Sequence, residues 1–361
     1  MKETLLVGII GTGGIAGGKH MPALAKLSGV EMTAFCDIEE AKAQAAAKHF
    51  GTADAKVYTD YHALLKDPTI DIVHVLTPND SHAEITIAAL EAGKHVMCEK
   101  PMAKKAADAR RMLEAAHRTG KKLSIGYQTR QSAESQYLKK ICMAGDLGEI
   151  YFARANALRR RAVPTWGVFL DAEKQGGGPL IDIGTHALDL TLWMMNNYEP
   201  KSVVGNVYRK LGDNEGAANA WGPWDPTKFT VEDSAFGFIT MKNGATIILE
   251  SSWAINLLET TEANCTLAGT KAGADMKNGL RINGENNGSM YVQNIQTGGG
   301  GVAYFDSAGT DLALEEARSW INAVRNDTDP VVLPEQALVV SEILEAIYES
   351  AKTGHPVMFD H

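Results

Sequence analysis

The stretch VGIIGTGGIAGG, residues 7–18, decides the fold of the first part of the chain. An apolar run leads directly into closely spaced glycines, with Gly11, Gly13 and Ala16 in a G-x-G-x-x-A arrangement. Between a buried strand and a helix, Gly11 permits a tight turn, and Gly13 lets the backbone approach a pyrophosphate at the start of the helix. Glycine-rich turns also occur simply as loops, so the motif needs support from the pattern around it.

That pattern extends from residue 5 to about residue 128 and alternates short apolar runs with helical stretches. The apolar runs are LLVGIIG, VEMTAFCD, DIVHVLTP, HVMCEKP and KLSIGYQ. The helical stretches between them cover residues 15–27, 39–50, 81–92 and 104–119. Strands that are apolar nearly throughout and separated by helices imply a parallel sheet covered on both faces. Residues 1–128 are therefore predicted to form a doubly wound α/β domain.

From residue 129 the rhythm changes, and we expect a second domain over 129–361. After a predicted helix at 132–144, the runs IYFARANAL, KSVVGNVYRKL, SAFGFITM and ATIILESSWAI read as strands with few helices between them, which predicts a largely antiparallel sheet. The dipeptide Asn243-Gly244 predicts a hairpin between two of these strands. Residues 213–228 and 277–301 are expected to be long loops, and residues 312–325 and 335–352 amphipathic helices.

The overall composition excludes several classes of function. The net charge of −9 removes the electrostatic basis for binding nucleic acid. The apolar run at residues 5–10 is too short for a signal peptide or a membrane span, so we expect a cytoplasmic protein without membrane contact. The four cysteines lie far apart and have no zinc-ligand spacing, which predicts free, mostly buried thiols and no metal site.

The second predicted strand ends in Asp37, where a carboxylate can accept hydrogen bonds from ribose hydroxyls. It would repel a 2′-phosphate, and no arginine in this turn could pair with one, so NAD is favoured over NADP. The alternative is a solvated aspartate at a strand end.

Two further strand ends lie at the same predicted edge of the sheet, where open α/β folds bind ligands. One carries Thr77-Pro78-Asn79, followed by His82, which is either a residue of the helix start or a cofactor contact. The predicted cofactor contacts are Gly11, Thr12, Gly13, Gly14, Ile15, Asp37, Thr77, Pro78, Asn79, His82, Glu99 and Lys100.

The other strand end, Glu99-Lys100-Pro101, points into the predicted crevice for the nicotinamide. The Lys100 ammonium can donate hydrogen bonds to a substrate oxygen and stabilise the charge that develops during hydride transfer. The alternative is a surface ion pair between Lys100 and Glu99.

The stretch GGGPLIDIGTHALDL, residues 176–190, places titratable groups in an apolar helix. Asp182 and His186 share one face if the helix has begun by Asp182, and a histidine there can take a proton from a substrate hydroxyl. The alternative is a helix cap with a satisfied core histidine. The glycines are expected to let the chain bend close to the cofactor. Asp189 could serve the imidazole, the helix surface or a packing contact.

Together GTGGIA, FCD, TPN, CEKP and GGGPLIDIGTHALDL, in this order, resemble the glucose-fructose oxidoreductase and inositol dehydrogenase (Gfo/Idh/MocA) family. The likeness covers nearly the whole chain. It implies an N-terminal Rossmann domain and a C-terminal α/β domain whose open, mostly antiparallel sheet packs in homodimers or homotetramers. It also implies an NAD or NADP enzyme that oxidises or reduces a carbinol of a sugar, a cyclitol or a related compound.

By this resemblance, Lys100, Asp182 and His186 match the catalytic residues of the family. His186 is then the general base, Lys100 polarises the reacting oxygen, and Asp182 is an orienting partner.

The segments RRRAVPTWGVF (159–169) and NAWGPWDP (219–226) match no general pattern of the family. Arg159 and Trp166 suit polyol hydroxyls and a sugar ring, although a solvated basic turn with a packing tryptophan explains them equally well. Tyr127, near the end of the last of the apolar runs, KLSIGYQ, is a further candidate for a substrate contact.

Three hypotheses for the function follow. The first is an NAD-dependent oxidoreductase acting on a sugar, cyclitol or glycoside, for instance at carbon 3 of a pyranoside. The second is a glycosidase that uses NAD transiently, by oxidation of carbon 3 and elimination. The third is a non-catalytic regulator that binds NAD or sugar, which need not keep all three catalytic groups found in this chain.

Overall fold

A computed structural model of the chain describes residues 3–297 and 311–359. It divides into two compact units. The first consists of Met1–Gln128 and Asp311–Leu338, and the second of Thr129–Thr310 and Val339–His361. The first unit therefore includes a segment that lies far beyond residue 128, where the sequence places the domain boundary.

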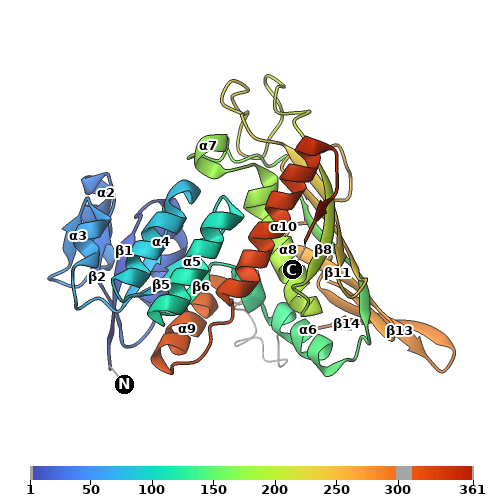
Figure 1. Cartoon of the computed structure of the whole chain (residues 1–361), viewed down its shortest axis with the longest axis horizontal. Coiled ribbons are helices and arrows are strands. Elements are labelled where there is room, and N and C mark those ends of the chain that lie inside the picture. Colours follow the sequence, from blue (N-terminus) through green and yellow to red (C-terminus); the bar gives the residue numbers. More distant parts are fainter. Residues whose placement is uncertain (1–2, 298–310, 360–361) are drawn as a thin grey trace. The chain divides into compact units, whose positions relative to one another are not determined.

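The first unit is built on a parallel sheet of six described strands in the order β3-β2-β1-β4-β5-β6. Figure 1 labels β1, β2, β5 and β6 of this sheet. The strands are β1 (Leu5–Ile10), β2 (Val30–Cys36), β3 (Lys56–Tyr58), β4 (Ile72–Val75), β5 (His95–Cys98) and β6 (Leu123–Ile125). This sheet confirms the predicted doubly wound fold. The strand order reverses between β1 and β4, and such a switch point is where open α/β sheets bind ligands.

The helices of the first unit include the four predicted between the strands, the late helix α9, and one short helix, α3, that the sequence did not predict, as it did not predict the strand β3 before it. They are α1 (Met21–Leu24), α2 (Glu40–Phe50), α3 (Tyr61–Leu65), α4 (His82–Glu91), α5 (Ala106–Thr119) and α9 (Leu312–Arg325), with the 3-10 turn η2 (Asn79–Ser81) before α4. The helix expected at 15–27 begins instead as a π-helical turn, η1 (Ala16–His20), before α1.

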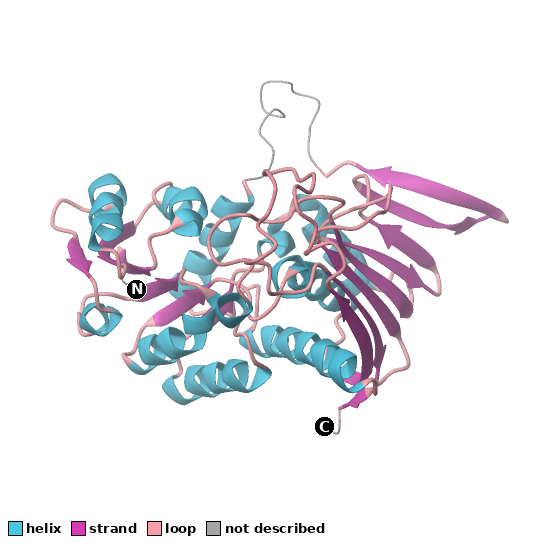
Figure 2. Cartoon of the chain, turned by 90° about the horizontal axis from the view of Figure 1, so that it is seen from above, coloured by secondary structure: helices cyan, strands magenta, loops and turns pink. Residues whose placement is uncertain are grey.

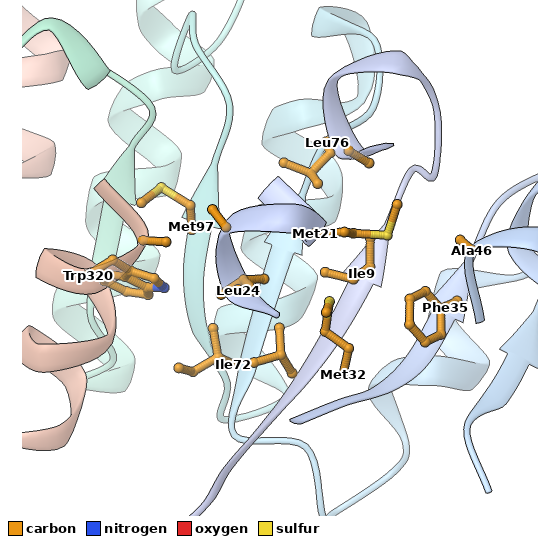
Figure 3. Packing of buried hydrophobic residues seen from close by; sticks show 14 of the residues in the cluster. Ile9, Met21, Leu24, Met32, Phe35, Ala46, Ile72, Leu76, Met97 and Trp320 are labelled. Atoms are coloured by element: carbon orange, nitrogen blue, oxygen red, sulfur yellow. The ribbon is translucent and has the colours of Figure 1, made fainter. Parts of the chain in front are cut away.

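Packing explains why residues 311–338 belong to the first unit. Trp320 of α9 is buried in the same hydrophobic cluster as Leu24, Ile72 and Met97 (Figure 3). The segment therefore completes the core of the first unit although it comes late in the sequence.

The second unit contains a sheet of nine described strands in the order β14-β13-β12-β11-β7-β10-β9-β8-β15. Figure 2 draws the strands of this sheet in magenta. The strands are β7 (Ile150–Leu158), β8 (Pro200–Tyr208), β9 (Ser234–Met241), β10 (Thr246–Ser252), β11 (Asn264–Gly269), β12 (Ala272–Asp275), β13 (Leu280–Asn286), β14 (Ser289–Ile295) and β15 (Val357–Met358). Among these strands β7 and β10 pair in parallel, and the other neighbours are antiparallel. The prediction of a mostly antiparallel sheet is confirmed.

Helices cover one face of this sheet. The helical elements are η3 (Gln128–Gln131), α6 (Ala133–Ala144), α7 (Ala172–Gln175), η4 (Leu180–Gly184), α8 (Thr185–Met195) and α10 (Pro334–Thr353). Close approach is visible at two strand glycines, since a Cβ atom at Gly205 or Gly237 would lie 2.7 or 2.6 Å from Ile347 of α10. The closing helices α9 and α10 match the predicted ranges within a residue.

The prediction of a loop at 277–301 is wrong, because β13 and β14 form a hairpin there. Residues 298–301 of the predicted loop lie outside the described residues. Nearly every residue of β14 is exposed, so the strand lacks the apolar alternation by which strands are recognised. Its turn carries Asn287 and Gly288 with positive φ angles of 52° and 75°, as in a tight hairpin.

Other expectations are confirmed. The hairpin at Asn243-Gly244 joins β9 to β10, and the described residues 213–228 contain no helix or strand. All four cysteines lie in the described part of the chain and are free, and three of them are buried. No helix among the described residues is long and apolar enough to cross a membrane. The cytoplasmic location stays a prediction.

Candidate active site

The glycines of the first turn have two different structural causes. Gly11 adopts a φ of 88°, and a Cβ atom there would lie 2.7 Å from the backbone carbonyl of Leu76. At Gly13 and Gly14, by contrast, an added Cβ atom would meet nothing within 4 Å. Gly11 is required by the protein itself, whereas Gly13 and Gly14 leave open space beside the backbone. A pyrophosphate needs such space in order to approach the N–H groups of this turn.

Asp37 is joined to the same turn. Its Oδ2 atom accepts hydrogen bonds from the backbone N–H and the hydroxyl of Thr12, at 2.9 and 3.1 Å. Its Oδ1 atom accepts from the N–H of Glu39 at 3.0 Å. The carboxylate is thus held at the tip of β2, beside the glycine turn. Its contact with a ribose stays a prediction.

His82 connects two strand-end turns. The ring is completely buried, with Nδ1 2.8 Å from the carbonyl oxygen of Pro101 and Nε2 2.9 Å from that of Thr77. Burial alone would lower its pKa, but Cys98 and the two carbonyls raise the pKa of His82 to about 9. An imidazolium can donate to both carbonyls at once. The structure favours a local structural role, and the cofactor contact of His82 stays a prediction.

Glu99 lies at the centre of a buried charge cluster in the first unit. Its Oε1 atom accepts from Lys19 Nζ at 2.7 Å and lies 2.9 Å from His20 Nε2, while Oε2 accepts from the backbone N–H of Lys100 at 3.0 Å. Lys19 also pairs with Glu316 at 2.8 Å. Burial opposes ionisation, but Lys19 and His20 hold the pKa of Glu99 well below its usual range. Glu99 is therefore no partner in a surface ion pair, and it fixes the backbone of Lys100.

In the second unit, Asp182 and His186 lie on one continuous helix. Asp182 belongs to the π-helical turn η4, which runs directly into α8, where His186 is the second residue. The helix has therefore begun before Asp182, as the proposed pairing of the two residues requires. The carboxylate is buried, and the imidazole is partly exposed. Single π-helical turns of this kind occur frequently at functional sites.

The carboxylate of Asp182 is held by a residue that the sequence analysis missed. Trp253 is completely buried, and its Nε1 donates to Asp182 Oδ2 at 3.0 Å. Arg159 Nη1 lies 3.9 Å from the same oxygen. Arg159 and Trp253 each follow one strand of the parallel pair β7 and β10, so they emerge at the same edge of the sheet.

Glu232 was also missed, and it holds the start of the helix. Its carboxylate accepts from the N–H groups of Gly178 and Leu180 at 2.8 and 3.2 Å and from the Tyr348 hydroxyl at 2.8 Å. Burial raises the pKa of Glu232. A Cβ atom at Gly177 would lie 2.0 Å from the Tyr348 hydroxyl, and one at Gly178 2.2 Å from the Glu232 carbonyl. These two glycines are explained by packing within the second unit, where the sequence suggested an approach to the cofactor.

Asp189 has a structural role. It forms a bidentate ion pair with Arg130, at 2.9 Å from Nε to Oδ2 and 2.6 Å from Nη2 to Oδ1, and neither side chain has exposed surface. Of the three roles considered for Asp189, the packing contact is the one the structure supports. Arg130 is the one charged residue of the turn η3, and no sequence pattern indicates that it pairs with Asp189.

The candidate substrate residues Arg159 and Trp166 lie in the second unit, and Tyr127 lies in the first. Arg159 pairs with Glu262, and its guanidinium lies 5.5 Å from the ring centre of Trp221, which in turn contacts Trp166. Tyr127 belongs to the first unit and is completely buried. Its contact with a substrate stays a prediction.

A glycine turn at the switch point of a doubly wound sheet, followed by a mostly antiparallel second sheet, is typical of two-domain dinucleotide-binding proteins. The chain matches the model of an oxidoreductase family with an NAD-binding Rossmann fold over residues 5–127 and the model of its C-terminal α/β domain over residues 139–359. It therefore belongs to the Gfo/Idh/MocA oxidoreductase family, as the motifs predicted. The predicted cofactor, NAD, is confirmed by the same match.

Several known proteins resemble this chain. D-glucoside 3-dehydrogenase of Escherichia coli is 37% identical over 98% of this chain and 97% of its own length. Inositol 2-dehydrogenase of Salmonella typhimurium is 35% identical over 54% of this chain and 55% of its own length. Among solved structures, an oxidoreductase domain protein from Kribbella flavida has a TM-score of 0.85 at 25% identity and covers 99% of this chain and 100% of its own. Levoglucosan dehydrogenase with NADH and levoglucosan has a TM-score of 0.84 at 22% identity, with the same coverage, and shows the common fold.

The two kinds of glycine predict opposite effects of an added methyl group. Gly11→Ala should destabilise the protein by more than about 1 kcal/mol, because the methyl group strains a positive φ and meets the Leu76 carbonyl. Gly13→Ala should leave the melting temperature unchanged and weaken NAD binding at least about tenfold, or 1.4 kcal/mol. Thermal unfolding and NAD titration check both. A Gly13→Ala protein that binds NAD normally would contradict the assigned cofactor turn.

The buried ion pair predicts a large loss of stability in Asp189→Asn. Removal of one partner leaves Arg130 uncompensated, so urea unfolding should show a loss of about 3–5 kcal/mol. The double variant Arg130→Met/Asp189→Leu should recover most of it. As a control, Asp275→Asn breaks the more exposed pair with Arg281 and should cost at most about 1 kcal/mol. A stable but inactive Asp189→Asn protein would instead favour a role beside the imidazole.

Proposed function

We propose that the protein is an NAD-dependent dehydrogenase that oxidises a ring carbinol of a sugar, cyclitol or glycoside, in the most specific form carbon 3 of a D-glucoside. The observation that carries the proposal is the environment of Asp182, a buried carboxylate fixed by Trp253, four residues before a partly exposed histidine on the same helix. The likeness to D-glucoside 3-dehydrogenase over nearly the full length supports this substrate class.

Three side chains carry out the proposed reaction. His186 is the general base, because an imidazole accepts a proton near neutral pH and can take it from the substrate hydroxyl. Lys100 donates a hydrogen bond to the reacting oxygen and stabilises the negative charge that grows on it. Asp182 orients the imidazole or a substrate hydroxyl. The hydrogen bond from the backbone N–H of Lys100 to Glu99 Oε2 restricts the backbone that carries the lysine side chain.

The first unit would hold the cofactor, which supplies the acceptor for the hydride when it is bound. The open space at Gly13 and Gly14 fits a pyrophosphate, and the remaining turn residues are Gly11, Thr12 and Ile15. Asp37 would accept hydrogen bonds from the ribose, and its charge would oppose a 2′-phosphate. The turn Thr77-Pro78-Asn79 follows β4, next to the switch point of the sheet.

The roles of His186 and Lys100 predict a kinetic result. With NAD and a panel of sugars, inositols and glycosides, turnover is followed by the absorbance of reduced nicotinamide. His186→Ala should lower kcat by about 10²- to 10⁴-fold, the usual contribution of a general base. Lys100→Ala should also lower it, and the exposed His355→Ala is the matched control. Unchanged turnover in either active-site variant would refute its assigned role.

Product analysis in the same experiment separates the three hypotheses. A ketone formed together with one reduced nicotinamide supports the dehydrogenase. Release of the aglycone without net reduction of NAD supports the transient oxidation of a glycosidase. Binding of NAD and sugar without any turnover supports a regulator.

The protein is also proposed to form a homodimer or homotetramer through the uncovered face of the nine-stranded sheet. In register across neighbouring strands, Val204, Phe238 and Ile248 lie side by side, and Val204 and Phe238 are 42% and 50% exposed. The opposite face is the one packed against α10. Apolar side chains gathered on one sheet face are typical of a subunit interface.

This interface predicts the mass of the protein in solution. Sedimentation should give a dimer or tetramer for the wild type and a smaller species for Phe238→Glu, because the charge is buried on association. Leu258→Glu, at an 88% exposed loop position, should leave the mass unchanged. A wild type that stays monomeric at micromolar concentration would argue against this interface.

A further inference from the structure

Two tryptophans from separate loops stand side by side on the surface of the second unit. Trp166 and Trp221 are 51% and 45% exposed, and their ring centres lie 4.9 Å apart at an interplanar angle of 79°. Indoles carry the largest apolar surface of any side chain, so two exposed ones in contact mark a place where something else binds.

The loops that carry the two indoles are fastened to each other. The side chain of Asn219 accepts from the Val163 N–H at 2.8 Å and donates to the Val163 carbonyl at 3.0 Å. The Thr165 hydroxyl donates to the Trp221 carbonyl at 3.1 Å. These hydrogen bonds lie close to both tryptophans in the sequence. The contacts between the two loops therefore hold the indole pair together.

Two chains of contacts lead from the indole pair to Asp182. In the first, the Arg159 guanidinium lies over the ring of Trp221 at 5.5 Å and reaches to 3.9 Å from Asp182 Oδ2. In the second, the ring centre of Phe169 lies 5.9 Å from that of Trp166 and 6.3 Å from that of Trp253. The Trp253 Nε1 donates to the same oxygen of Asp182. The indole pair is therefore connected through Arg159, and through Phe169 and Trp253, to the carboxylate that the proposed function uses to orient the imidazole or a substrate hydroxyl.

The chemistry of the pair selects an uncharged ring. Pyranose rings and aryl groups present flat apolar faces that stack on an indole, and the two perpendicular indoles offer one face and one edge. The positive charge of Arg159 is already matched by Glu262, whose carboxylate accepts from Arg159 Nε at 2.6 Å. An anionic group would therefore gain little from Arg159.

We infer that Trp166 and Trp221 form a stacking platform for a second ring of the substrate, on the aglycone side of the sugar that is oxidised. The inference depends on the proposed function for its substrate, and it makes that function more specific. The enzyme would prefer glycosides with a ring-shaped aglycone, a second sugar or an aryl group, over a sugar with a small substituent.

The test compares three glucosides that share the oxidised ring: methyl β-D-glucoside, phenyl β-D-glucoside and cellobiose. In Trp166→Ala and Trp221→Ala, kcat/KM for the two-ring substrates should fall about tenfold further than for methyl glucoside, mainly through KM. Trp221→Phe should restore much of the difference, because it keeps a stacking ring. Met290→Ala removes a 93% exposed apolar side chain on β14 and is the control. A fall that is equal for all three glucosides would overturn the inference.

Binding measured without turnover separates this inference from the proposed reaction. Titration of His186→Ala with NAD and phenyl glucoside or cellobiose should change tryptophan fluorescence. The dissociation constant from this titration should be higher in His186→Ala/Trp221→Ala. If that result holds while no glucoside is oxidised by the wild type, the platform stands and the proposed reaction fails. If oxidation occurs but the indole variants bind all three glucosides as tightly as the parent, the platform is refuted and the reaction stands. An altered subunit mass in Trp221→Ala with unchanged selectivity would instead assign the indoles to a protein contact and refute the platform.

Discussion

The ion pair between Arg130 and Asp189 ties helix α8 to the turn η3 in the interior of the second unit. Helix α8 is apolar on nearly all sides and lies in the interior, where an unpaired carboxylate would cost several kcal/mol. The ion pair therefore favours the helix position in which Asp189 contacts both nitrogens of Arg130. In that position Asp182, seven residues earlier, meets Trp253. Residues outside the proposed chemistry thus determine where the proposed catalytic groups lie.

The first unit uses the same principle with a different set of side chains. Glu99 is buried and negative, and Lys19, His20 and the N–H of Lys100 surround it. The lysine of the Glu-Lys-Pro turn is therefore held through its neighbour. His82 adds a second connection, between the carbonyls of Thr77 and Pro101. The turns at Thr77 and at Glu99-Lys100-Pro101 are thus both held by buried titratable side chains, His82 and Glu99.

The sequence predicted those parts of the fold in which one strand and its turn are sufficient evidence. The glycine turn, Asp37 and the Glu-Lys-Pro turn each follow an apolar strand, and the doubly wound sheet that they implied is confirmed. It could not show Trp253 beside Asp182, because this contact depends on the parallel pairing of β7 and β10 within an otherwise antiparallel pattern. The hairpin of β13 and β14 escaped because exposed strands lack alternation, although Asn287-Gly288 was a usable signal.

The late segment of the first unit has a consequence for biosynthesis. Trp320 fills its hydrophobic core, and Glu316 pairs with the buried ammonium of Lys19. A ribosome that has completed the strands of the first sheet has still to make β7 to β14 of the second sheet before it reaches these residues. During that interval the nascent first unit carries an uncovered apolar surface and a lysine that lacks one of its two carboxylate partners. A nascent chain at this stage therefore exposes apolar surface that a chaperone can cover.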